Sequence, residues 1–136
     1  MGSKKQVFIT KLLHFDEDKF ESHIKKRKSE KLIENEADYI EIIEDVLYNF
    51  DRVFYIAKTR NNDQLSFIKS KSGWLLGFTI KDFKIHTCLK IHDFFTIEEY
   101  LEHLKKSKKD IETYKEVNYE ESEFQRIIKR VQEKIK

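Results

Sequence analysis

The sequence has no proline, a single cysteine and only three glycines among its 136 residues. One cysteine cannot form an internal disulfide or a cysteine-based zinc site. The three glycines, at positions 2, 73 and 77, do not make a glycine-rich phosphate loop. Apolar stretches are only a few residues long, which excludes a membrane-spanning helix, and residues 1–5 lack the apolar block of a signal peptide. These absences predict a compact cytoplasmic protein.

Signatures of metal and carboxylate chemistry are also missing. The chain has no His-Glu-x-x-His motif, and nothing singles out two catalytic carboxylates among its 25 acidic side chains. His86 and His92 fall on one face of a predicted strand, but about 20 Å apart, which is too far to share an ion. We therefore predict no metal site and no cofactor.

What the chain does have is enough apolar surface for one core. Hydrophobic residues make up 39% of it, including 11 phenylalanines and 6 tyrosines, which argues against disorder. A length of 136 residues suits one compact domain. We predict a single domain over residues 1–136, helical over 12–50, a sheet over 51–93 and helical again over 96–136.

Two helices are predicted in the first fifty residues. Residues 16–28 begin with acidic side chains and end with basic ones, as the helix dipole favours. His23 lies on the apolar stripe of this helix with Phe20 and Arg27. A second helix over residues 36–48 has its own apolar face, formed by Tyr39, Ile40, Ile43, Val46 and Leu47.

Four strands are predicted next, because apolar and β-branched segments alternate with short turn signals. Their residues are 52–59, 64–70, 74–80 and 83–92. Turns this short favour an antiparallel meander. The last segment has a period of two, which predicts one face with Phe83, Ile85, Thr87, Leu89 and Ile91. The same period predicts an opposite face with Lys84, His86, Cys88, Lys90 and His92.

The remainder of the chain is predicted to be helical. Thr96 is a predicted N-cap, with Glu98 and Glu99 in the first turn, and a last helix spans residues 120–135. The fold class is therefore α+β, with N-terminal helices, a four-stranded antiparallel β-meander and C-terminal helices.

Positive charge is concentrated in the predicted sheet. The net charge of +2 predicts no partner by itself, but residues 51–95 carry 8 basic and 4 acidic side chains together with 8 of the 18 aromatic residues. Basic side chains interleaved with aromatics form a surface for polyanions. An ordinary amphipathic sheet with a lysine-rich wet face has the same pattern. On the first interpretation, nucleic acid would contact Lys69, Lys84, Lys90 and His92.

Cleaving RNA without a metal needs few chemical groups. A base takes the proton of the ribose 2′-hydroxyl, cations stabilise the phosphorane-like transition state, and an acid protonates the leaving 5′-oxygen. Histidine suits the proton transfers, and lysine or arginine suits the developing phosphate charge. The composition permits a ribonuclease of this kind without identifying one.

The order of these elements resembles that of a known superfamily. A basic helix that contains His23 comes first, and a second helix follows it. A strand then carries Lys58, with Arg60 just past its end, and after two more strands comes one with Ile85-His86-Thr87. Over roughly residues 20–92 this resembles the phage-associated nucleases of the barnase, EndoU, colicin E5/D and RelE-like superfamily.

The resemblance implies a set of site residues. His23 would be the acid or base, Lys58 and Arg60 would bind phosphate, and Thr87 would be a hydroxyl donor near the scissile phosphate. His86 would face the phosphate instead if its face of the sheet is the open one. Each residue also has a structural interpretation, because a helix stripe can hold a histidine, a strand end can hold solvated cations, and a core can hold a threonine. The sequence leaves open which face the helices cover, since the third strand is apolar on both.

Three functions are consistent with these patterns. The first hypothesis is a metal-independent ribonuclease that acts as a toxin-like, phage or mobile-element effector. The second is a non-enzymatic accessory protein that binds nucleic acid through its basic sheet or inhibits a host protein. The third is an assembly protein that joins another chain through the apolar seam of its last helix. The predicted partners are RNA, a cognate antitoxin or immunity protein, or a host protein, without a membrane, and the predicted assembly is a monomer or dimer.

Overall fold

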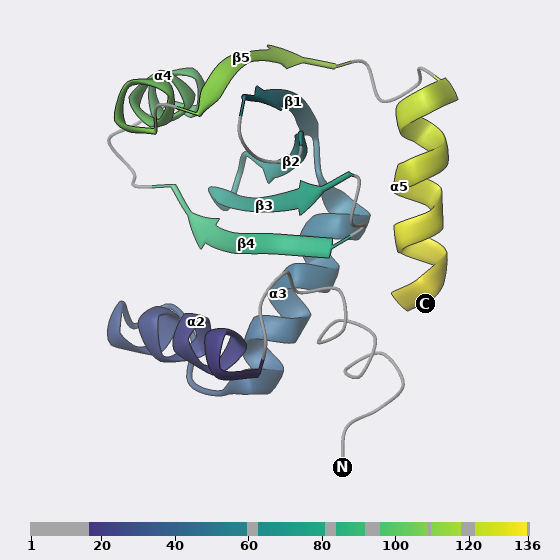
Figure 1. Ribbon diagram of the computed structural model, residues 1–136. Helices are drawn as coiled ribbons and strands as arrows, with labels where there is room; N and C mark the ends of the chain where they lie inside the picture. Colours follow the sequence, from purple (N-terminus) through teal and green to yellow (C-terminus); the bar gives the residue numbers. More distant parts are fainter. Residues whose placement is uncertain are drawn as a thin grey trace.

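The fold is built around one antiparallel β-sheet with helices packed against it (Figure 1). The computed structural model describes residues 17–59, 63–80, 84–91, 96–108, 110–117 and 122–135. Within these residues the helices are α2 (Glu17–Ser29), α3 (Glu36–Asn49), α4 (Ile97–Ser107) and α5 (Ser122–Ile135). The strands are β1 (Arg52–Lys58), β2 (Gln64–Lys69), β3 (Trp74–Thr79), β4 (Lys84–Lys90) and β5 (Ile111–Glu116).

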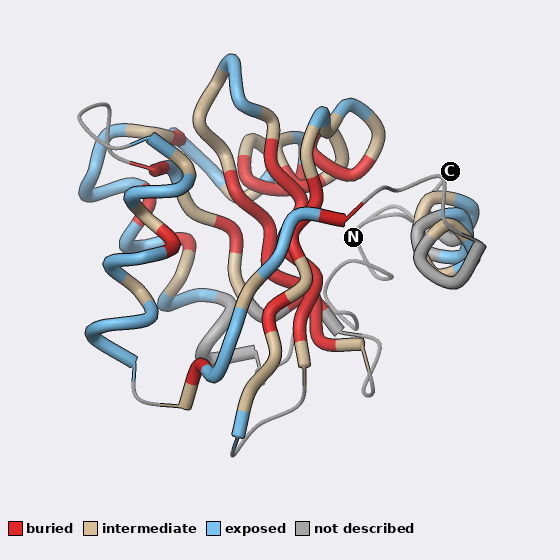
Figure 2. The backbone as a smooth tube through the Cα atoms, turned by 90° about the horizontal axis from the view of Figure 1, so that it is seen from above, coloured by how far each residue is buried: buried red, intermediate tan, exposed pale blue. Residues whose placement is uncertain are grey.

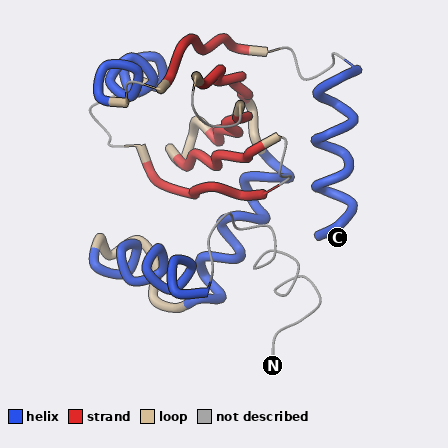
Figure 3. Tube along the Cα trace, viewed as in Figure 1, coloured by secondary structure: helices blue, strands red, loops and turns tan. Residues whose placement is uncertain are grey.

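Four of the strands form a meander, and the fifth returns to its first edge. β1 to β4 each pair with the next strand, and β5 pairs with β1, so the order across the sheet is β4-β3-β2-β1-β5 with every pair antiparallel. Figure 3 shows these strands gathered at the centre, with the helices outside them. The predicted α+β class and the antiparallel meander are confirmed.

Strand β5 corrects the prediction that residues 96–136 are wholly helical. It pairs with β1 through Ile56 and Tyr114 and through Phe54 and Glu116. Only Ile111 of this strand is buried, because the strand lies at the sheet edge and turns charged side chains to solvent. Such a sequence has no apolar alternation to mark it, and its partner lies more than fifty residues earlier in the chain.

One face of the sheet, here called the α3 face, packs against α3. The predicted apolar face of α3 is confirmed, since Tyr39, Ile40, Ile43, Val46 and Leu47 are all buried. These side chains pack with Leu65 and Phe67 of β2 and with Ile24 of α2 in one hydrophobic cluster. Helix α5 is fastened to the end of α3, where the Tyr48 hydroxyl donates to the Gln132 carbonyl at 2.5 Å.

The opposite face, here called the α4 face, has its own cluster beneath α4. Phe54 and Ile56 of β1 and Leu75 of β3 are buried there against Leu101 of α4 and Ile111 of β5. Figure 2 shows the result from above, with buried segments in red concentrated in the strands and on the inner sides of the helices. Both faces of the sheet are therefore covered by helix, which explains why β3 is apolar on both.

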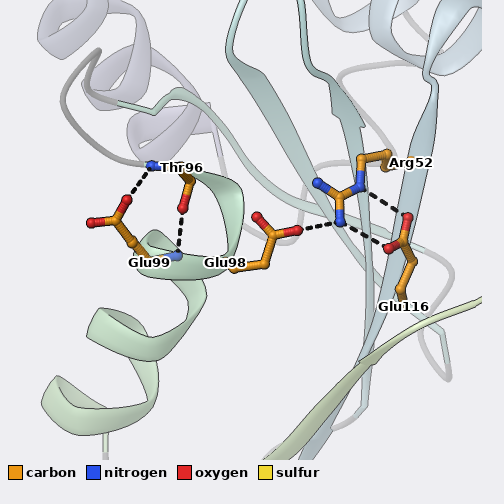
Figure 4. A network of polar contacts seen from close by, with 5 residues as sticks. All are labelled: Arg52, Thr96, Glu98, Glu99 and Glu116. Atoms are coloured by element: carbon orange, nitrogen blue, oxygen red, sulfur yellow. Dashed lines mark hydrogen bonds and ion pairs between the residues drawn. The ribbon is translucent and has the colours of Figure 1, made fainter.

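Polar contacts hold α4 in position over the sheet (Figure 4). The predicted N-cap is confirmed, because Thr96 and Glu99 form a reciprocal capping box with bonds of 3.1 and 3.2 Å. Arg52 of β1 donates to Glu116 of β5 from Nε at 2.9 Å and from Nη2 at 2.8 Å, and it also pairs with Glu98 of α4. This guanidinium joins the first turn of α4 to two strands. Among the described residues, no helix is long and apolar enough to cross a bilayer.

A β-bulge in β4 corrects the predicted period of two. Gly77 of β3 pairs with Thr87, whereas the next residue, Phe78, pairs with Ile85, so the register passes over His86. Ile85 therefore packs with the α3-face cluster, together with Cys88, instead of sharing a face with Thr87. The sequence does not predict His86 as the extra residue, because a bulge is defined by the pairing of two strands.

Candidate functional site

A cavity of about 440 Å³ opens on the α4 face of the sheet. Alternate residues of β1, β2, β3 and β4 form its floor, and side chains of α2 and α4 line it as well. Three of the predicted site residues meet here, His23 of α2, Lys58 of β1 and Thr87 of β4. They come from elements far apart in the chain, so the fold alone brings them to one place.

The cavity is strongly cationic. Besides His23, it is lined by Lys26 and Arg27 of α2, by Lys58, and by Lys108 just after α4. None of the described residues that line it carries a carboxylate. Four cations without a lining anion make a site suited to a phosphate or another anion.

His23 faces the cavity half-buried, and its surroundings disfavour its charged form. Burial lowers the pKa of His23 below its usual value near 6.5, and the charges of Arg27 and Lys26 lower it further. The imidazole is therefore neutral at neutral pH, which is the form that can accept a proton. The i, i+4 spacing of His23 and Arg27 places both on the same side of α2.

Arg27 is the most buried cation of the cavity. Its side chain is 5% exposed, and Nη1 bonds Glu30 at 2.6 Å. Its Nε, which is also buried, has no hydrogen-bond partner among the described residues. A buried guanidinium with an unused donor is costly unless an anion completes its bonding. Arg27 was not among the predicted site residues, although its spacing from His23 on the helix stripe already pointed to the same surface.

Lys58 stands at the end of β1, where two backbone features fix its position. Its N–H donates to the Asp63 carboxylate at 3.0 Å, and Asp63 also accepts a bond from the Tyr55 hydroxyl. The pairing of β1 with β5 shifts register between Ala57 and Lys58, a second bulge beside the cavity. Burial lowers the pKa of Lys58, while Asp110 opposes that shift and Lys108 adds to it.

Thr87 reaches the cavity because of the bulge at His86. Ser66, Gly77 and Thr87 are directly paired across β2, β3 and β4, so they form one row of the floor. Gly77, which has no side chain, separates the two hydroxyl side chains in this row. The structural interpretation of Thr87 placed it with Ile85 in a core, and the two residues instead lie on opposite faces.

Two buried polar residues of the floor were not anticipated. Gln64 and Ser66 of β2 are 8% and 2% exposed, and both line the cavity. In this strand polar residues alternate with Leu65 and Phe67, and such alternation does not show which face of a sheet is covered. Their position in β2, the central strand of the sheet, explains why these polar side chains are covered.

The remaining predicted residues are not brought to the cavity. Lys69 lies on the α3 face, where its Nζ pairs with Asp45 at 2.5 Å. Lys90 is exposed at the end of β4 and does not line the cavity. The other predicted residues fall outside the described part of the structure: Arg60 and His92 entirely, and Lys84 and His86 for their side chains. No group of three or more metal-ligand side chains among the described residues is placed to hold an ion.

Comparison with known proteins identifies a family to which the sequence is similar. The model of a family described as phage-Barnase-EndoU-ColicinE5/D-RelE like nuclease3 matches residues 13–86, which is more than half of the chain. The chain belongs to this nuclease family. The resemblance inferred from the order of the elements is thereby confirmed. No curated protein and no solved structure matches the chain. The part matched to the nuclease family includes His23, Arg27 and Lys58 and ends just before Thr87.

Proposed function

We propose that the protein is a metal-independent ribonuclease whose active site is the cavity on the α4 face. Membership in a nuclease family supports nuclease activity. The observation that carries the finer proposal is the meeting of His23, Lys58 and Thr87 with the buried Arg27 in one cationic cavity. These residue types suffice for the proton transfers and charge stabilisation that cleavage next to a ribose 2′-hydroxyl requires.

The proposed reaction starts at His23. A neutral imidazole nitrogen takes the proton of the 2′-hydroxyl, and the 2′-oxygen then bonds to phosphorus as the bond from phosphorus to the 5′-oxygen breaks. Arg27 stabilises the charge on the phosphate oxygens through charge-assisted hydrogen bonds, and the Thr87 hydroxyl donates another. The leaving 5′-oxygen takes a proton from the Lys58 ammonium, whose lowered pKa makes it a stronger acid. The product ends are a 2′,3′-cyclic phosphate and a 5′-hydroxyl.

The direct test is incubation of the protein with total RNA in EDTA, followed by analysis of the new ends. We expect cleavage that leaves 2′,3′-cyclic phosphates, and we expect His23→Ala and Lys58→Ala each to lower the rate by about 10²-fold or more. His103→Ala and Lys25→Ala are matched controls, because both residues are exposed and lie outside the cavity lining. A folded sample that cleaves no RNA under any condition would contradict the proposal.

A non-catalytic role in nucleic-acid binding is the second candidate, and the four cavity cations favour it. Binding of RNA should then fall steeply with salt, because phosphate contacts release counterions. His23→Ala separates the two functions. A binding protein should keep most of its affinity in this variant, and wild type should show no turnover.

The biological setting belongs to the same proposal. A ribonuclease of phage type would act as a toxin-like effector on RNA in the cytoplasm, and a cognate antitoxin or immunity protein would be its partner. Induced expression in a bacterial host should arrest growth for wild type and not for His23→Ala. Equal growth with both variants, at equal protein levels, would contradict the toxin role.

A further inference from the structure

Gln64 is the most unusual neutral side chain of the cavity floor. It is more than nine-tenths buried, with an exposed fraction of 8%, and it faces the cavity from a central strand. None of the side-chain hydrogen bonds formed among the described residues involves its amide. A carboxamide that lines a cavity can exchange hydrogen bonds with a ligand that enters it.

The position of Gln64 places its amide close to the proposed chemistry. Its direct partner on β1 is Ile56, and Lys58 is the next residue of β1 on the same face. Side chains in this diagonal relation are within reach of each other. A ligand with a phosphate beside Lys58 is therefore within reach of Gln64.

An aromatic side chain lines the same cavity from α4. Tyr100 is partly buried among apolar lining residues, of which Leu104 lies one turn further along α4 and Ile111 begins β5. Burial raises the pKa of Tyr100, so its ring stays neutral at neutral pH. A neutral aromatic ring in an apolar wall suits stacking against a nucleobase, which is how proteins hold single-stranded RNA bases.

We propose that Gln64 and Tyr100 form a nucleobase-recognition subsite, in which Tyr100 stacks on one base and Gln64 reads its hydrogen-bonding edge. The proposal rests on the ribonuclease function proposed above and names what selects its cleavage site. The carboxamide offers one donor and one acceptor, and each of the four bases presents its own pattern of donors and acceptors. The volume of about 440 Å³ lies in the range that holds a small ligand.

The first experiment maps cleavage ends on a pool of random RNA sequences. Wild type should prefer one base next to the cleaved bond by about ten- to a hundred-fold, as a bidentate amide contact allows. Gln64→Leu should abolish this preference while cleavage continues, and Gln64→Glu should favour a different base because it replaces the donor with an acceptor. Tyr100→Phe, which keeps the ring, should keep the preference that Tyr100→Leu weakens. An unchanged base preference in folded Gln64→Leu and Gln64→Glu would overturn the proposal.

The second experiment does not depend on turnover. The four nucleoside 3′-monophosphates are titrated by calorimetry into wild type, Gln64→Leu and Gln64→Glu. Base-selective binding that is lost in Gln64→Leu supports the subsite, even if wild type cleaves no RNA and the ribonuclease function fails. Cleavage and binding that show no base preference in wild type overturn the subsite and leave the ribonuclease function standing. A wild type that neither binds a nucleotide nor cleaves RNA overturns both.

Discussion

The Cγ2 atom of Thr87 lies 3.3 Å from the position that a Cβ atom on Gly77 would occupy. The two residues face each other across β3 and β4 in the floor of the cavity. A methyl group at position 77 would therefore crowd the side chain of Thr87. Lack of space for a Cβ atom therefore favours glycine at position 77, since the backbone there is not in a left-handed conformation.

Gly77→Ala should destabilise the protein, and Thr87→Ser should reverse that effect. We expect the single alanine variant to lose about 1 kcal/mol of unfolding free energy through overpacking. In the Thr87→Ser background the methyl group that causes the contact is gone, so the same alanine should be close to neutral. A double-mutant cycle from denaturant unfolding measures the coupling. Additive effects of the two substitutions would contradict the predicted contact.

The stability of the protein should fall in mild acid because of His23. Its pKa is lowered in the folded state by burial and by Arg27 and Lys26, so the unfolded chain binds the proton more readily. Stability is then lost as pH falls from the ordinary value near 6.5 through the lower pKa of the folded state. Melting temperatures between pH 7.5 and 5 should decline less for His23→Gln than for wild type. His103→Gln, at an exposed position of α4, should behave like wild type.

The proposed ribonuclease activity should have a bell-shaped pH profile. Its acid limb should lie below pH 6.5, because His23 has to be neutral to accept a proton and its pKa is lowered. Its alkaline limb should lie below pH 10.5, because Lys58 has to be charged to donate one and its pKa is also lowered. Lys58→Arg should move the alkaline limb upward or abolish it, measured as kcat/KM against pH. An alkaline limb that is unchanged in Lys58→Arg would remove Lys58 as the acid.

Inorganic phosphate should bind beside Arg27 and raise the melting temperature of the folded protein. Arg27→Lys keeps the charge but loses the forked set of donors. We expect its phosphate affinity to fall about tenfold, which corresponds to about 1.4 kcal/mol. Arg126→Lys, at an exposed position of α5, is the matched control and should retain the affinity of wild type. Equal affinities of the Arg27 variant and wild type would show that Arg27 does not bind phosphate.

Local patterns in the sequence predicted much of the fold. The helix stripe of α3, the capping box at Thr96 and the first four strands all follow from short-range spacing and turn chemistry. Strand β5 could not be predicted in this way, because it is defined by pairing with β1 and not by its own residues. The bulge at His86 is likewise a property of two paired strands.

The candidate site was predictable only in part. His23, Lys58 and Thr87 could be named because order and residue type pointed to them, but their shared cavity depends on how α2 and α4 lie against the sheet. Gln64 was not among the predicted site residues. It begins a predicted strand, and only the structure shows that it is buried and lines the cavity. The burial of a polar residue such as Gln64 depends on the tertiary fold, which short-range sequence patterns do not describe.

Strand β5 and helix α4 lie beyond residues 13–86, the part of the chain matched to the nuclease family. The cavity therefore combines residues of both parts, since the matched part contains His23, Arg27 and Gln64, and the rest of the chain contains Thr87 and Tyr100. Arg52, bonded to Glu98 and Glu116, joins the two. On the proposed function, the choice of base would therefore depend on a segment of the chain that the family match does not cover.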